Sequence, residues 1–106
     1  MSTNLLHMRN FTEYRPENGE RNLMYLRDDR GRDWYQWRYM FKPSTMKVLY
    51  APNGDVASIV QSLEDTELLN PLGLSLVEMP CNPKYLDPDV KWRYVDGKLV
   101  LHEHQK

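Results

Sequence analysis

Residues 92–101 read WRYVDGKLVL, and this segment decides the fold class because it predicts a β-hairpin by itself. Asp96-Gly97 is a two-residue turn sequence whose positive φ angles suit the right-handed twist of paired strands. The turn fixes the register, so Tyr94 faces Leu99 and the other pairs follow outward. Those pairs are Trp92 with Leu101 on the same apolar face, and Val95 with Lys98, Arg93 with Val100 and Lys91 with His102 on the opposite face. This segregation is typical of a half-buried two-stranded ribbon.

A second hairpin is predicted over residues 46–60, MKVLYAPNGDVASIV. Pro52 presets the first corner of a turn, Asn53 comes next, and Gly54 can adopt the left-handed conformation. The predicted register places Tyr50 across from Val56, and Met46 across from Val60.

A third hairpin is predicted over residues 23–38, LMYLRDDRGRDWYQWR, with Gly31 as the left-handed residue of its loop. A loop of three residues places Tyr25 opposite Tyr35, Leu23 opposite Trp37, and Arg27 opposite Asp33. A loop one residue longer would shift this register.

The segment between the hairpins carries a helix signal. Ser62 and Asp65 form a capping pattern, and Pro71 cannot continue a helix, so a short helix is expected over residues 63–69. A strand is expected over residues 74–79 and a loop over residues 81–89. We therefore predict a mainly β (α+β) fold, in which one domain, residues 1–106, forms a small antiparallel sheet of hairpins with one short helix.

The aromatic segment DWYQWRYMF, residues 33–41, allows two interpretations. A helix would align Trp34, Trp37 and Phe41. A strand is favoured, since aromatic rings suit a pleated surface. Such a strand places Tyr35, Trp37, Tyr39 and Phe41 on one face, of which Tyr35, Trp37 and Phe41 are expected in the core. Its other face carries Trp34, Gln36 and Arg38, which we expect to bind a partner, because Trp and Arg are enriched among interface hot spots.

Composition excludes several classes of protein. The 106 residues include 14 basic and 15 acidic side chains, and this balance argues against a nucleic-acid-binding protein. The single cysteine, Cys81, indicates a chain made in a reducing compartment. No stretch approaches the about 20 apolar residues of a membrane span, and the first residues lack the pattern of a signal peptide. A soluble protein made inside the cell is expected.

Candidate catalytic and metal-binding groups are sparse. The sequence contains no glycine-rich phosphate loop, and Cys81 has no local partner that would activate it as a nucleophile. His102 and His104 could hold a metal weakly, although a solvated chain end is the favoured interpretation. The cluster Glu64, Asp65 and Glu67 is explained by the dipole of the predicted helix. We therefore expect a protein that is not an enzyme and that has no cofactor and no metal.

Several motifs in a fixed order resemble the phage tail fibre assembly proteins. They begin with NFTEYRPEN at residues 10–18 and cover nearly the whole chain. The later motifs are Asp33-Trp34-Tyr35, Lys47 to Tyr50, Asn53-Gly54, Pro71 to Met79, and Trp92 to Gly97. The chain departs from the family pattern at Ala51-Pro52, where an acidic residue usually comes after the tyrosine. Many members also continue past the last hairpin into a long helical region, so the resemblance is to their N-terminal domain.

The resemblance implies a chaperone-like protein that binds the C-terminal tip of a trimeric tail fibre and promotes its folding and assembly. Such a protein acts in the cytoplasm of the host bacterium. In some relatives it stays on the fibre tip in the virion and influences host attachment. No catalytic residue or cofactor comes with the family. Two alternatives are a carbohydrate-binding module, in which Trp34, Tyr35 or Trp37 stacks on a host surface glycan, and a host-directed phage inhibitor of unrelated mechanism.

Overall fold

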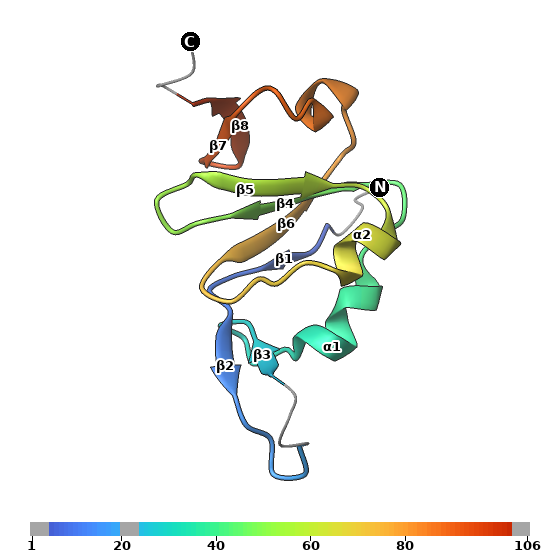
Figure 1. Cartoon of the computed structure of the whole chain (residues 1–106), viewed down its shortest axis with the longest axis vertical. Helices are drawn as coiled ribbons and strands as arrows, with labels where there is room; N and C mark the ends of the chain where they lie inside the picture. The colour runs from blue at the N-terminus through green and yellow to red at the C-terminus, as the bar shows by residue number, and fades with distance from the viewer. Residues whose placement is uncertain (1–4, 20–23, 103–106) are drawn as a thin grey trace.

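The computed structural model describes residues 5–19 and 24–102, and its centre is a four-stranded antiparallel sheet (Figure 1). The strand order is β1-β6-β4-β5, so β5 lies at one edge. The strands are β1 (His7–Met8), β4 (Met46–Tyr50), β5 (Val56–Val60) and β6 (Ser75–Met79).

Two small two-stranded sheets and short helical segments complete the fold. β2 (Thr12–Tyr14) pairs with β3 (Tyr25–Arg27), and β7 (Trp92–Val95) pairs with β8 (Lys98–Leu101). The helices are α1 (Trp34–Trp37) and α2 (Leu63–Glu67), with 3₁₀ turns at Arg38–Met40 and Pro83–Leu86. The predicted class, mainly β with antiparallel hairpins and a short helix, is confirmed. No helix within the described ranges is both long enough and apolar enough to cross a membrane.

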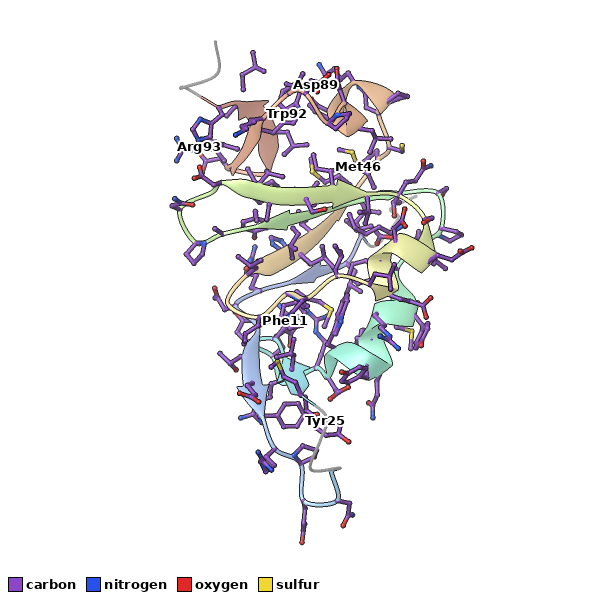
Figure 2. All side chains as sticks on the ribbon, viewed as in Figure 1. Phe11, Tyr25, Met46, Asp89, Trp92 and Arg93 are labelled. Carbon is purple, nitrogen blue, oxygen red and sulfur yellow. The ribbon has the colours of Figure 1, made fainter. Side chains whose placement is uncertain are left out.

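The central sheet separates two apolar cores. Successive residues of a strand point to opposite faces, so Val48 belongs to one core and Leu49 to the other. Figure 2 shows Phe11 on one side of the sheet and Met46 on the other. One core contains Met8, Phe11, Leu26, Trp34, Phe41, Leu49 and Leu76. The other contains Met46, Val48, Val77 and Leu99, against which the aromatic rings of Tyr50, Tyr85, Trp92 and Tyr94 pack.

The predicted hairpin at residues 92–101 is confirmed in detail. Asp96 and Gly97 have φ angles of 51° and 79°, as its turn requires. The register pairs Trp92 with Leu101, Arg93 with Val100, Tyr94 with Leu99, and Val95 with Lys98. The backbone N–H of His102 also donates to the carbonyl of Lys91.

The hairpin of β4 and β5 is confirmed at its turn, but its predicted register is wrong at the far end. Tyr50 faces Val56 as expected, whereas Val60 faces Lys47 instead of Met46. The cause is a bulge, because the register shifts between Leu49 and Tyr50 and gives β5 one extra residue. As a result, Val56 and Ile59 both pack against the core of Val48.

The predicted strand over residues 33–41 is wrong. Arg27 and Asp33 do form the predicted bridge, but the chain then enters α1, and β3 pairs with β2 instead. Tyr25 is therefore the strand partner of Tyr14 and not of Tyr35, although the rings of Tyr25 and Tyr35 touch edge to face. The predicted Leu23–Trp37 pair involves Leu23, which lies outside the described residues.

Asp33 is the physical reason for this change of structure. Its extended backbone and side chain form an N-cap, in which the carboxylate accepts a hydrogen bond from the backbone N–H of Gln36 at 3.1 Å. The Tyr14 hydroxyl also donates to this carboxylate, which ties β2 to the start of α1. Trp34, the first residue of α1, then lies in the same core as Phe41, which follows the 3₁₀ turn in an extended conformation.

The predicted helix and strand after β5 are confirmed as α2 and β6. Ser62 caps α2 by accepting from the backbone N–H of Asp65 at 3.0 Å. The predicted loop at residues 81–89 contains the second 3₁₀ turn, where the Asn82 side chain accepts from the backbone N–H of Lys84.

A buried polar network joins β4 and β6. Lys47 and Glu78 are strand partners with exposed fractions of 0% and 2%. The Lys47 ammonium donates to the carbonyls of Lys42, Thr45 and Gln61 at 2.5, 2.9 and 2.5 Å, while burial lowers its pKa. The Glu78 carboxylate accepts from the backbone N–H groups of Leu6 and Lys42 and from the Thr45 hydroxyl. These hydrogen bonds compensate the two buried charges. Because several of them go to Lys42 and Thr45, they also fix the loop before β4.

Candidate partner-binding surfaces

The structure separates the three residues that the sequence predicts as partner-binding. Trp34 is only 3% exposed and packs edge to face against Phe11 and Phe41, with ring centroids 5.6 and 6.3 Å apart. The prediction that Trp34 faces outward is wrong, because the helical rotation of α1 turns its ring into the core. Gln36 is exposed, and Arg38 is half-buried.

Arg38 is held between two tyrosines. Its guanidinium carbon lies 5.0 Å from the ring centroids of both Tyr35 and Tyr39, and one nitrogen donates to the Tyr39 hydroxyl at 2.8 Å. Another nitrogen donates to the carbonyl of Glu67 at 3.4 Å, which joins the 3₁₀ turn to α2. Its Nε is buried and has no hydrogen-bond partner among the described residues. These contacts fix the guanidinium, so a partner would meet it with little loss of side-chain entropy.

Exposed apolar side chains accompany Arg38. Tyr39, Met40 and Leu68 are 54%, 62% and 82% exposed. Tyr39 and Met40 lie on the 3₁₀ turn Arg38–Met40, and Leu68 is the C-cap residue of α2. We call this region the helical surface; it consists of Tyr35, Gln36, Arg38, Tyr39, Met40 and Leu68. Amphipathic aromatic rings beside an arginine are the composition that protein interfaces favour.

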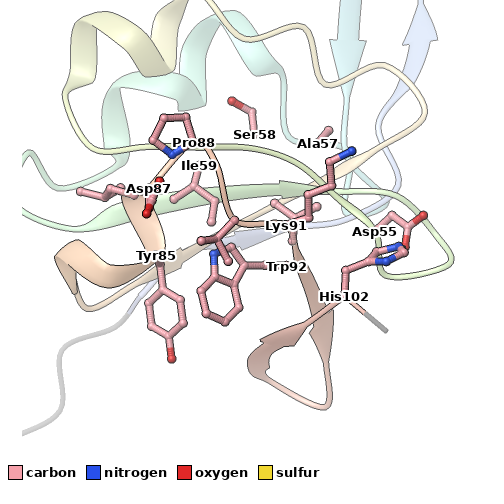
Figure 3. Close-up of a pocket in the computed structure, with 13 residues that line it drawn as sticks. Asp55, Ala57, Ser58, Ile59, Tyr85, Asp87, Pro88, Lys91, Trp92 and His102 are labelled. Atoms are coloured by element: carbon pink, nitrogen blue, oxygen red, sulfur yellow. The ribbon is translucent and has the colours of Figure 1, made fainter. Parts of the chain in front are cut away.

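A groove of about 780 Å³ lies on the other side of the molecule, between β5 and the chain that leads into β7 (Figure 3). Asp55 and Arg93 form a single bridge, and the Tyr94 N–H donates to the Gly54 carbonyl at 2.8 Å. Beyond this bridge β5 and β7 do not form a ladder. Two prolines, Pro83 and Pro88, are the sequence signal for this opening, since proline interrupts strand pairing.

The groove has apolar walls and charged ends. Val56, Ile59, Val90 and Trp92 are among its apolar lining residues, and Tyr85 packs edge to face on Trp92 with ring centroids 4.7 Å apart. The indole Nε1 of Trp92 is buried and has no hydrogen-bond partner in the described chain. The charged lining residues are Asp55, Asp87 and Lys91, and the imidazole of His102 lies beside Asp55.

The candidate metal ligands His102 and His104 do not gain support. His102 lies 3.3 Å from the Asp55 carboxylate at the end of the groove, and His104 lies outside the described residues. Among residues 5–19 and 24–102, no group of three or more His, Cys, Asp or Glu side chains is arranged to hold a metal ion. Cys81 is half-buried just before the second 3₁₀ turn.

His7, on strand β1 of the central sheet, makes polar contacts with Tyr50 of β4 and with Arg9. Its Nε2 lies 2.5 Å from the Tyr50 hydroxyl, and its Nδ1 lies 3.3 Å from a guanidinium nitrogen of Arg9. Burial, with the charge of Arg9, lowers the pKa of His7 from 6.5 to about 4. Because arginine can only donate, Nδ1 of the neutral ring accepts and Nε2 donates to Tyr50.

Comparison with known proteins identifies relatives of one kind, although no family model matches the chain. The chain is 29% identical to the tail fiber assembly protein U′ of Escherichia phage Mu, over 91% of its own length. It is 30% identical to the protein of the same name from Escherichia phage P1, over 91%, and 29% identical to a probable tail fiber assembly protein of Escherichia phage P2, over 89%. The resemblance to tail fibre assembly proteins is confirmed. The chain spans 57% to 58% of the length of these relatives.

The motif residues that carry the likeness to tail fibre assembly proteins have structural roles. Asp33 caps α1, and Trp34 fills a core. Lys47 and Glu78 form the buried network, and Gly97 completes a turn. The motif residues therefore stabilise the fold of this chain, and its contact surface has to be found from exposure and chemistry.

Proposed function

We propose that the chain is a phage tail fibre assembly factor that binds the C-terminal tip of a trimeric tail fibre and promotes its folding. The observation that carries this proposal is the similarity to phage tail fibre assembly proteins over 91% of the chain. Long β-rich fibres form through non-local contacts and expose strand edges during assembly. A small protein that covers such an edge would suppress incorrect pairing.

The helical surface supports this role as a contact region. It combines exposed Tyr39 and Met40 with a guanidinium already fixed by Tyr35 and Tyr39. We place Gln36 and Arg38 at this contact. The protein would act in the cytoplasm of the host bacterium during assembly and remain on the fibre tip in the virion, where it would influence host attachment.

Co-expression with the C-terminal part of the fibre protein encoded next to this chain, followed by size exclusion, tests the proposal. The two proteins are expected to elute together. Arg38→Ala should weaken the complex by about 2 kcal/mol, because it removes the cation shared by two tyrosines. Arg30→Ala, at an exposed position outside the helical surface, is the matched control and should bind normally. Separate elution of the wild-type chain and the fibre would refute the proposed function.

The proposed role needs no catalytic chemistry. Cys81→Ser should leave fibre assembly intact, and so should a strong chelator. The measurement is the yield of correctly trimerised fibre after co-expression. A loss of yield in either experiment would favour an enzyme or a metalloprotein instead.

The carbohydrate-binding alternative is not favoured. Of its three candidate stacking rings, Trp34 is buried in the core, and the face of Trp37 is occupied by the Arg32 guanidinium at 5.1 Å. Tyr35 is 36% exposed but already contacts Arg38. These rings therefore do not offer the open flat platform that sugar stacking requires.

A further inference from the structure

β5 is a strand with an open outer edge. It pairs with β4 on one side, whereas on the other side the backbone pairing with β7 in the described chain is limited to the bridge between Asp55, just before β5, and Arg93, together with the hydrogen bond from the Tyr94 N–H to the Gly54 carbonyl. A strand directs backbone N–H and C=O groups toward both of its neighbours. The residues Val56–Ile59, which line the groove, therefore present to it a strand edge about 13 Å long.

The groove beside this edge offers side-chain contacts of a defined kind. The bulge in β5 turns both Val56 and Ile59 toward the core face that also carries Trp92. Figure 3 shows Ile59 and Trp92 facing each other across the groove, with Asp55 and His102 together at one end. The buried indole N–H of Trp92 needs an acceptor that this part of the chain does not supply.

We propose that the outer edge of β5 and this groove bind an extended strand of the tail fibre polypeptide, by addition of that strand to the sheet. The inference rests on the proposed function and adds, on the other side of the molecule, a second contact with the fibre to the one proposed at the helical surface. The strand would bond through its backbone to β5, and one of its carbonyls would accept the Trp92 indole N–H. Its side chains toward the groove would be mainly apolar, because Val56, Ile59 and Trp92 line the groove, while Asp55, Asp87 and Lys91 bring both signs of charge to its ends.

A second copy of the chain is a poorer occupant. In each copy the segment Tyr85–Trp92 forms the wall that faces β5 across the groove. Pairing two β5 edges would bring both walls into the space beside the paired strands. A groove of about 780 Å³ has the size of a cleft for a small ligand or a short extended segment, and not for a folded edge with its wall.

Hydrogen exchange on the full chain, alone and with the trimeric C-terminal fragment of the neighbouring fibre protein, tests the proposal. Amide exchange over residues 56–60 should slow at least tenfold in the complex. A complex that forms without protection of residues 56–60 would overturn strand addition at β5 and leave the proposed function standing. Absence of any complex would overturn both.

A conservative substitution tests the contribution of the indole. Trp92→Phe keeps an aromatic ring in the groove and removes its N–H, so fibre binding should weaken about three- to tenfold, as expected for one lost hydrogen bond. Trp37→Phe is the matched control, because it makes the same chemical change outside the lining of the groove. Equal affinity of the two variants would overturn the indole contact. If Trp92→Phe does not fold, the exchange experiment on the wild-type chain still decides the proposal.

Discussion

Trp34 and Gln36 are two positions apart in α1 but have opposite surroundings. The Trp34 ring is enclosed by Phe11 and Phe41, whereas Gln36 is exposed. Trp34→Ala should lower the free energy of unfolding by about 3–5 kcal/mol, the usual cost of losing a buried ring. Gln36→Ala should change it by less than about 0.5 kcal/mol. Urea denaturation measures both, and an unchanged midpoint for Trp34→Ala would contradict its position in the core.

Glu78 is the second residue whose substitution is diagnostic. Glu78→Leu keeps the side-chain volume but leaves the N–H groups of Leu6 and Lys42 and the Thr45 hydroxyl without their acceptor. The buried Lys47 also loses its nearby opposite charge. We expect a loss of about 3–5 kcal/mol in the free energy of unfolding.

Glu13→Leu provides the control for this substitution. Glu13 lies on β2 and is exposed, so the same chemical change should have little effect there. Similar denaturation midpoints for the two variants would show that the Glu78 carboxylate does not stabilise the loop before β4.

Among the elements, the β7–β8 hairpin makes the clearest prediction. Gly97 has a φ angle of 79°, and a Cβ at this position would meet no atom within 4 Å, so only backbone strain opposes a side chain. Gly97→Val should therefore destabilise the protein by about 1 kcal/mol or more. Lys98→Val is the control: it introduces the same side chain at the next position, which is a strand residue of β8, and should not cause this strain. A thermal melt unchanged by Gly97→Val would contradict the turn assignment.

Local signals account for most elements that the sequence predicted. Asp96-Gly97 and the Ser62 cap act within a few residues, so the hairpin of β7 and β8 and the helix α2 could be predicted without tertiary information. The bulge in β5 was not predicted, although the three-residue spacing of Val56 and Ile59, which pack on the same core, departs from the period of two of a regular strand.

The aromatic segment shows where local reasoning fails. Its residues satisfy the period of a strand and that of a helix, and aromatic composition favoured the strand. The spacing of Asp33 and Gln36 is the capping signal that would have favoured the helix. Gln36 is exposed whether the segment forms a strand or a helix. The position of Trp34, in contrast, depends on which of the two forms: a strand turns its ring outward, and the helix turns it into the core. The groove depends on contacts between β5 and a segment about 30 residues later, which no local pattern reports.

The stability of the whole molecule should depend on pH through His7. Its pKa is about 4 in the folded chain and near its ordinary value of 6.5 in the unfolded chain. The unfolded chain therefore binds more protons between these values, so the contribution of neutral His7 is complete above pH 6.5 and is lost as the pH falls toward 4. Arg9, Arg32, Asp29 and the aromatic rings of Tyr50 and Tyr94 surround the imidazole and share this environment.

His7→Gln isolates this effect. The variant should lose less stability than the wild-type chain when both are moved from pH 7 to pH 4.5, because glutamine does not titrate. Denaturation curves at the two pH values give the difference. Equal losses for the two proteins would mean that His7 is not held neutral by the fold.

The buried pair Lys47 and Glu78 has a consequence for the fidelity of folding. A sheet with apolar residues on both faces could pair in several registers that all bury similar surface. In the correct pairing, Lys47 lies opposite Glu78. A slip of β4 along β6 by two residues would keep each apolar face but place Lys47 opposite Leu76. That slip would also separate the Glu78 carboxylate from Lys42 and Thr45, and an uncompensated buried charge costs several kcal/mol. Misregistered forms of the domain are thus rejected by electrostatics, although hydrophobic burial alone would tolerate them.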